Sequence, residues 1–168
     1  MKKILSIFIF LLLLVGCSLS NTPTSKVEEL FNKYQTLDTD IKSGIESVLE
    51  GESLTNDQKE RYRKLMEKQY RNLVYQIKDE IIDGDTAIIV TEIEVTNYKK
   101  AINETSTYYL DKEGYTVEDY NNTKLNNLED TKEKVIYTLN IEVKKDNDGN
   151  WKLSSLSNDT IKKIQGMY

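Results

Sequence analysis

Apolar residues recur every three or four positions along the chain after residue 21. Thr22 and Pro23 suit the cap and first turn of a helix, and the periodic residues then run on towards Gly51: Val27, Leu30, Phe31, Tyr34, Leu37, Ile41, Ile45, Val48 and Leu49. This spacing is typical of one face of an amphipathic helix. We therefore predict one long helix that ends near Gly51.

A second helical stretch follows it. Thr55 and Gln58 have the spacing of a capping box, in which each side chain bonds the other residue's backbone. Apolar residues continue behind it at helical spacing: Tyr62, Leu65, Met66, Tyr70 and Leu73. The predicted helix covers residues 55–71.

The apolar pattern then changes to alternation, which is typical of β-strands. Residues 73–82 lead into Asp83-Gly84-Asp85, a hairpin turn signal. The next stretch places five residues on one face of a strand: Ala87, Ile89, Thr91, Ile93 and Val95. Glu92 and Glu94 fall on the opposite face. Two adjacent antiparallel strands are expected.

A second pair of strands is predicted near the end of the chain. The first has five apolar residues on one face: Val135, Tyr137, Leu139, Ile141 and Val143. Residues 146–150 turn the chain, and Trp151 and Leu153 return beside it. A short helix over 158–165, capped by Asn158 or Asp159, completes the chain.

Residues 98–134 interrupt the alternation between the two strand pairs. Their apolar positions follow helical steps in part, and the stretch contains five tyrosines: Tyr98, Tyr108, Tyr109, Tyr115 and Tyr120. We interpret it as a partly helical insertion. The predicted fold class is α+β, with two N-terminal amphipathic helices packed on a curved antiparallel sheet of about four strands.

The first sixteen residues have the order of a secretory signal. Lys2 and Lys3 precede an apolar run from Ile4 to Val15, and this run is shorter than the roughly 20 residues that span a bilayer core. Leu14-Val15-Gly16-Cys17 resembles a bacterial lipobox, in which the cysteine is lipidated and becomes the first mature residue. An ordinary signal peptide that ends near a cysteine is the alternative.

These features predict the organisation of the chain. Residues 1–16 form the signal peptide, 17–21 the lipidated Cys17 with a short tether, and 22–168 a single domain of ordinary size. The protein is expected on the extracytoplasmic face of the cell membrane. A tether of five residues reaches no more than about 18 Å, so the domain should lie close to that surface.

Composition narrows the chemistry. Loss of two leader lysines leaves 21 basic against 28 acidic residues, a net charge of −7, which disfavours nucleic acid as a partner. Cys17 is the single cysteine, so a disulfide framework or thiolate metal site is not expected. The chain has no histidine, the usual general base and metal ligand. We predict neither cofactor nor metal, and an enzyme is disfavoured.

Three stretches resemble the NTF2-like superfamily, a cystatin-like α+β cone, and similar Gram-positive bacterial lipoproteins. They are the Thr22-Pro23 opening with the helix face that follows it, the hairpin at residues 83–87, and the turn at residues 148–152. The resemblance covers residues 22–157 and implies long helices across a curved sheet. Enzymes of that superfamily use Asp, Tyr or His in a pocket, and no Asp or Tyr of this chain could be matched to those sites.

Aromatic residues supply the candidate sites. Tyr75, Tyr137 and Trp151 fall on apolar strand faces, where they either line a ligand pocket or pack the core; core packing is favoured. Three tyrosines of the insertion form a candidate partner surface or pack it onto the sheet, without preference between the two: Tyr108, Tyr109 and Tyr120.

Acidic residues offer weaker candidates. Asp146-x-Asp148-x-Asn150 resembles the start of a calcium-binding loop, but Trp151 stands where glycine is required and Ser157 where glutamate is, so a hairpin turn is favoured. Glu92, Glu94 and Glu142 on one sheet face could form an acidic patch; we interpret them as solvated.

Two functional hypotheses remain. The first is a non-enzymatic, membrane-anchored domain that binds a protein, a peptide or a small ligand at the cell surface. The alternative is an NTF2-like enzyme or carrier for a hydrophobic small molecule, which requires a cavity of roughly 300 Å³ or more with a carboxyl group of raised pKa. We expect instead a filled core closed by the insertion.

Overall fold

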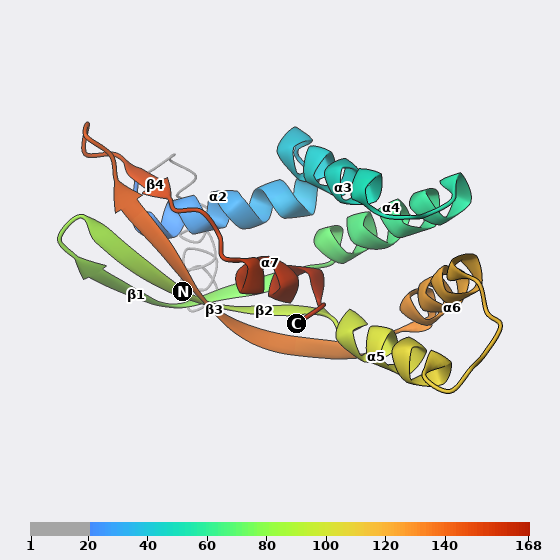
Figure 1. Ribbon diagram of the computed structural model, residues 1–168. Coiled ribbons are helices and arrows are strands. Elements are labelled where there is room, and N and C mark those ends of the chain that lie inside the picture. Colours follow the sequence, from blue (N-terminus) through green and yellow to red (C-terminus); the bar gives the residue numbers. More distant parts are fainter. Residues whose placement is uncertain (1–20) are drawn as a thin grey trace, which may run out of the picture.

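The computed structural model describes residues 21–168, so the predicted signal peptide, Cys17 and most of the tether lie outside it (Figure 1). A curved antiparallel sheet runs through the molecule, with helices over one face and at one end. The predicted fold class is confirmed. Within residues 21–168, every helix is too short or too polar to span a bilayer.

The predicted first helix is two helices, α2 (Pro23–Thr36) and α3 (Thr39–Gly51). Thr22 caps α2 as expected. The helix stops because Leu37 adopts a left-handed conformation with φ 53°, and Asp38 then caps α3 by accepting a hydrogen bond from the Asp40 N–H at 2.9 Å. Leu37 is buried, so the apolar spacing continues across the break and conceals it.

The second predicted helix is confirmed as α4 (Asn56–Arg71). Its capping box is complete: the Thr55 N–H donates to Gln58 Oε1 at 3.0 Å, and the Gln58 N–H donates to Thr55 Oγ1 at 3.3 Å. The buried Gln69 side chain ties the end of α4 to the strands, because it bonds both the N–H and the carbonyl of Thr96 at 3.1 Å.

The four strands occur in chain order, β1 (Val74–Asp83), β2 (Thr86–Thr96), β3 (Lys134–Lys145) and β4 (Trp151–Leu153). Each is antiparallel to the next. A two-residue turn at Gly84-Asp85 joins β1 to β2, and β2 pairs with β3 without interruption. The alternation predicted for β2 is confirmed, with its apolar face buried.

The space between the helices and the concave sheet face is packed with side chains. Val27 and Phe31 of α2 and Ile89 of β2 are fully buried there, together with Leu139 and Ile141 of β3. Ile164 of α7 (Asn158–Gln165) is also buried in this cluster.

Ser157, rather than Asn158 or Asp159, caps α7; its hydroxyl accepts a hydrogen bond from the Thr160 N–H at 3.1 Å.

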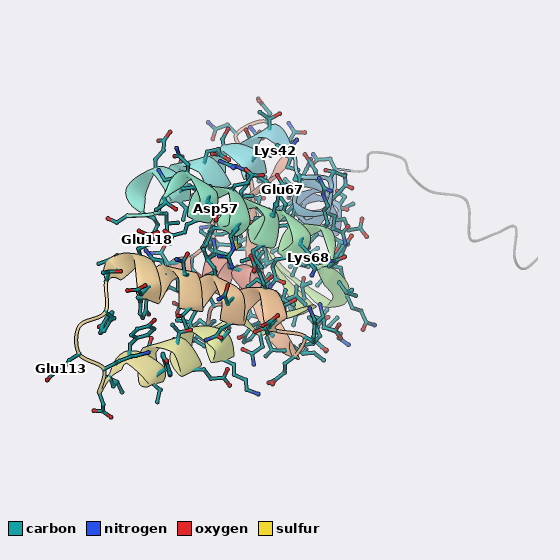
Figure 2. All side chains as sticks on the ribbon, turned by 90° about the vertical axis from the view of Figure 1, so that its right-hand side faces the viewer. Lys42, Asp57, Glu67, Lys68, Glu113 and Glu118 are labelled. Atoms are coloured by element: carbon teal, nitrogen blue, oxygen red, sulfur yellow. The ribbon has the colours of Figure 1, made fainter. Side chains whose placement is uncertain are left out.

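The insertion forms two helices, α5 (Tyr98–Tyr109) and α6 (Val117–Asp130), at the end of the sheet opposite the hairpin turns (Figure 1). Figure 2 looks onto this end, where α6 lies between α4 and α5. Glu113 projects from the loop that connects α5 to α6. Leu125 and Leu128 form a second buried cluster with residues of α4 and α5. Arg61 joins α4 to α6 through Glu129 at 2.8 Å.

The Thr91 hydroxyl in the centre of β2 is buried without a hydrogen-bond partner. Replacing Thr91 with valine should raise the free energy of unfolding by about 1 kcal/mol, because an unsatisfied buried polar group costs about 1–3 kcal/mol. Urea unfolding followed by the fluorescence of Trp151 measures this.

Thr105→Val is the matched control. Thr105 is equally buried, but its hydroxyl donates to the Ala101 carbonyl at 2.9 Å and accepts from Asn127 Nδ2 at 2.8 Å. This substitution should destabilise the protein. Equal losses for the two variants would show that the Thr91 hydroxyl is satisfied.

Candidate functional site

A groove of about 690 Å³ lies between α5, β3 and the last residue, and we name it the tyrosine groove. Three elements bring together the tyrosines that give it its name, Tyr108, Tyr137 and Tyr168. The remaining lining residues are mostly polar and come from the start and middle of α5: Asn97, Lys99, Lys100, Asn103, Glu104 and Thr107.

The three tyrosines are held in different ways. Tyr137 projects from the concave face of β3, and its hydroxyl donates to the Tyr168 carbonyl at 3.0 Å. Their rings meet edge to face, with centroids 6.0 Å apart. Tyr108 and Tyr168 are 57% and 49% exposed, so two large aromatic surfaces are available to a ligand. Partial burial raises the pKa of the Tyr137 hydroxyl, and the nearby Tyr168 raises it further.

Some polar side chains of the groove already bond other residues of the protein, and others can bond a ligand. Lys100 pairs with Glu133, and the hydrogen bond between them lowers the pKa of that carboxyl. The side chains of Lys99, Asn103 and Glu104 form no hydrogen bond or ion pair with any other residue of 21–168. An ammonium, an amide and a carboxylate therefore face the groove with hydrogen-bonding capacity to offer a ligand.

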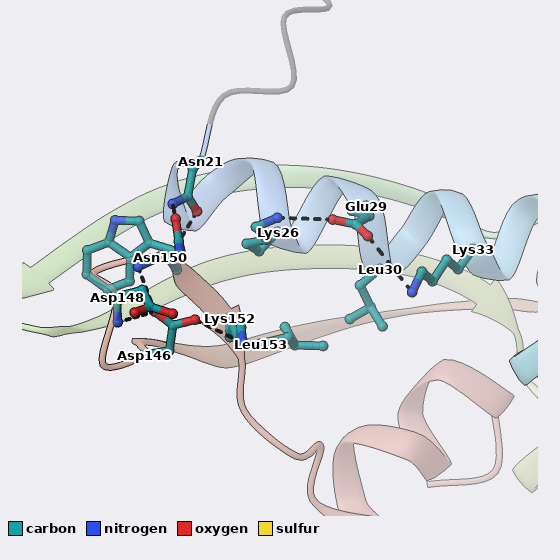
Figure 3. A pocket seen from close by; sticks show the side chains of 11 residues that line it. Asn21, Lys26, Glu29, Leu30, Lys33, Asp146, Asp148, Asn150, Lys152 and Leu153 are labelled. Carbon is teal, nitrogen blue, oxygen red and sulfur yellow. Dashed lines mark hydrogen bonds and ion pairs between the residues drawn. The ribbon is translucent and has the colours of Figure 1, made fainter.

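A second groove, of about 620 Å³, lies between α2 and the β3–β4 hairpin (Figure 3). Five of the six charged residues that line it form ion pairs with one another: Glu29 contacts Lys26 at 3.4 Å and Lys33 at 3.9 Å, and Lys152 contacts Asp146 at 2.9 Å. Because each of these ions already has a partner, this groove offers less to a ligand than the tyrosine groove does.

The predicted pocket residues lie at three separate places. Tyr75 stacks on Phe31 with ring centroids 4.6 Å apart, and Trp151 is buried under the Lys145 ammonium at 4.9 Å. Tyr137 alone reaches the tyrosine groove. Tyr75 and Tyr137 both pair with Ile93, on opposite sides of β2, but the core between helices and sheet is filled.

The predicted partner surface is divided in a similar way. Tyr109 is buried between α5 and α6, where its hydroxyl bonds Thr123 at 2.9 Å and its ring contacts the neighbouring Tyr108, Tyr115 and Tyr120. It therefore holds the insertion together. Tyr108 is exposed and belongs to the tyrosine groove, whereas Tyr120 is half-buried on α6.

The structure adds Tyr168, Lys99, Asn103 and Glu104 to the candidate site. Helical spacing could have placed Lys99, Asn103 and Thr107 on one side of α5, since they are four residues apart. No sequence pattern connects Tyr168 with Tyr137, which lie 31 residues apart and meet through the packing of α7.

Asp146 and Glu92 among the acidic candidates have local partners. Asp146 accepts hydrogen bonds from the N–H groups of Asp148 and Asn150 at 3.0 and 2.9 Å, so the predicted hairpin turn is confirmed. Glu92 pairs with Lys78 at 2.8 Å and lies on the convex sheet face. Within residues 21–168, no three acidic or cysteine side chains come together as a metal site.

The alternative hypothesis requires a carboxyl group of raised pKa beside a cavity. Wherever the pKa of a carboxyl group in residues 21–168 is clearly shifted, it is lowered by a hydrogen-bonding partner, as Arg61 does for Glu129 and Lys152 for Asp146. Such carboxylates are ionised acceptors, and none is suited to act as a general acid near neutral pH.

No protein-family model and no curated protein matches this chain. One similar solved structure is that of a candidate lipoprotein, ycdA, from Bacillus subtilis, with 14% sequence identity and a TM-score of 0.37. The match covers 83% of this chain and 46% of that one, so this chain spans less than half of the other's length. This likeness is too low to carry an argument, and the NTF2-like resemblance stays a prediction.

Proposed function

We propose that the protein is a lipid-anchored domain on the extracytoplasmic face of the membrane that binds another protein through the tyrosine groove. The observation that carries the proposal is the groove itself, in which exposed Tyr108 and Tyr168 flank polar groups with free hydrogen-bonding capacity. Tyrosine supplies large contact area at a low entropic cost, and it is enriched at binding surfaces.

The position of the groove suits this role. Asn21 is held at the opposite end of the molecule, where its amide group bonds the Asn150 side chain and the Trp151 N–H, both at 2.9 Å. A lipid on Cys17 would therefore hold the end of the molecule that carries the β3–β4 hairpin next to the bilayer. The four residues from Ser18 to Asn21 reach at most about 14 Å. The groove, beside α5, would then face away from the membrane.

The double variant Tyr108→Ala, Tyr168→Ala should reduce capture of the partner from detergent-solubilised membranes by about tenfold or more, since truncating an aromatic anchor commonly costs over 1 kcal/mol. The immobilised full-length lipoprotein serves as bait, and mass spectrometry quantifies the captured protein.

Tyr115→Ala and Tyr120→Ala are the matched controls, because both tyrosines belong to the insertion and neither lines the groove. The amount of partner protein that these variants capture should stay within about twofold of the amount captured by the unmodified protein, a change of under 1 kcal/mol. The reverse pattern, with loss only in the controls, would place the interface around Tyr115 and Tyr120 and contradict the proposal.

A further inference from the structure

β3 has an open edge beside the tyrosine groove. β2 pairs with β3 from Lys134 to Lys144, whereas β4 pairs with only three residues on its other side, Val143–Lys145. Within residues 21–168, no strand pairs with residues 134–141 on that side. An unpaired edge presents backbone N–H and carbonyl groups that can accept another strand.

The hydrogen bonds near β4 identify which residues face this edge. Glu142 accepts from the Ser154 N–H at 3.0 Å, and the Asp146 N–H donates to the Asn150 carbonyl at 2.8 Å, so even-numbered residues face away from β2. Strand backbones repeat every two residues. Ile136, Thr138 and Asn140 therefore direct their N–H and carbonyl groups outward.

This edge is more accessible than the one on β1. On β1, a bulge at Lys78 interrupts the strand, and the Thr24 N–H of α2 donates a hydrogen bond to the Glu80 carboxylate. Asp79 and Asp83 add negative charge to that edge. Bulges, charges and covering elements are the usual protection against strand addition. At the β3 edge, the side chains of Ile136, Thr138 and Asn140 are exposed, and the interaction made there is a long 3.5 Å hydrogen bond from Lys163 Nζ to the Thr138 carbonyl.

The edge and the groove form one continuous surface. Tyr137 belongs to the same stretch of β3, and its side chain lines the groove. Side chains alternate between the two faces of a sheet, so a strand placed beside β3 would direct every second residue towards the groove. Main-chain pairing and side-chain pockets are the two components of peptide recognition by strand addition.

The charge around this surface is positive. Lys99 and Lys100 line the groove with Glu104, Lys163 lies at the edge, and Glu133 pairs with Lys100. Three lysines against two glutamates give a local net charge of +1, on a chain whose net charge is −5. An acidic ligand is favoured here, although the molecule as a whole would repel it.

We propose that the β3 edge receives an extended, acidic peptide segment of a partner protein as a fifth strand, with alternate side chains in the tyrosine groove. This inference rests on the proposed function, for which it specifies the conformation and the charge of the ligand. The backbone pairing would begin where β4 ends and continue towards Lys134.

The test uses the full-length lipoprotein in detergent and a capped, fluorescein-labelled heptapeptide that alternates valine or tyrosine with aspartate or glutamate. At millimolar peptide, amide hydrogen exchange at Ile136, Thr138 and Asn140 should slow measurably. A peptide with lysine in place of each acidic residue should have much less effect. Unchanged exchange at these three amides, or equal protection by both peptides, would overturn the proposal.

Two substitutions at one position separate pairing from groove binding. Thr138→Pro removes an outward N–H without removing a bond to β2, which edge positions tolerate, and should weaken binding of the acidic peptide by about tenfold. Thr138→Val keeps that N–H and should change binding by less than about twofold. Thermal unfolding and circular dichroism confirm that both variants are folded.

The outcomes also distinguish this inference from the proposed function. If Tyr108→Ala, Tyr168→Ala weakens peptide binding and Thr138→Pro does not, the groove binds its ligand without strand addition, and the inference is wrong while the proposed function survives. If neither change affects peptide binding, the inference is wrong, and the proposed function fails with it only if the double variant also captures the partner protein normally.

Discussion

Replacing Gly166 with alanine is expected to lower the free energy of unfolding by about 3 kcal/mol, the combined cost of left-handed strain and of overpacking. Gly166 ends α7 with φ 71°, a conformation that disfavours a side chain. A Cβ atom there would collide with the Thr96 carbonyl and stand 2.6 Å from Gln69 Nε2. The substitution would therefore separate the junction where α4, β2 and α7 meet.

The same junction holds the start of α5, because the Lys99 N–H donates to the Gly166 carbonyl at 2.8 Å. Displacement of Gly166 should therefore also loosen the tyrosine groove. Urea unfolding, followed by the fluorescence of the single tryptophan, Trp151, measures the change in stability.

Gly84→Ala is the control for Gly166→Ala. Gly84 also has a positive φ, 57°, but an added Cβ would meet no atom within 4 Å. It should cost only the backbone strain, about 1 kcal/mol. If the two variants lose equal stability, the close approach at Thr96 contributes nothing, and the junction is looser than described.

Replacing Cys17 with alanine should abolish fatty-acid incorporation completely. The thiol is the group to which a lipid would be attached, and the chain has no other cysteine to replace it. Two or more acyl chains anchor a protein stably, at about 0.8 kcal/mol per buried methylene, whereas the domain described offers no membrane-spanning helix in their place. Metabolic labelling with a fatty acid and the mass of the N-terminal peptide measure the effect.

Ser18→Ala controls for a general change near the cleavage point and should leave labelling intact. An unmodified protein that incorporates no fatty acid would support the ordinary signal peptide and contradict lipid anchoring. Residual labelling of Cys17→Ala would place the lipid at another residue.

Local patterns were sufficient for the strands and for the ends of α4, but not for the ends of the two helices in the insertion. Alternation identified the buried face of β2, and the capping box at Thr55 identified the start of α4. The break between α2 and α3 was missed because Leu37 keeps the apolar spacing while its backbone turns left-handed. Periodicity reports which side chains are buried, and it does not report the backbone conformation between them.

The sequence by itself determined the signal-like leader, the α+β class, the alternating strand faces and the helical character of the insertion, because each depends on residues a few positions apart. Tertiary structure alone decided that Tyr108, Tyr137 and Tyr168 line one groove and that Tyr109 is buried. It also decided that part of β3 pairs with no strand on one side within residues 21–168. The reason is physical: contacts between distant residues depend on how α5, α7 and the sheet pack together, and local spacing carries no record of that packing.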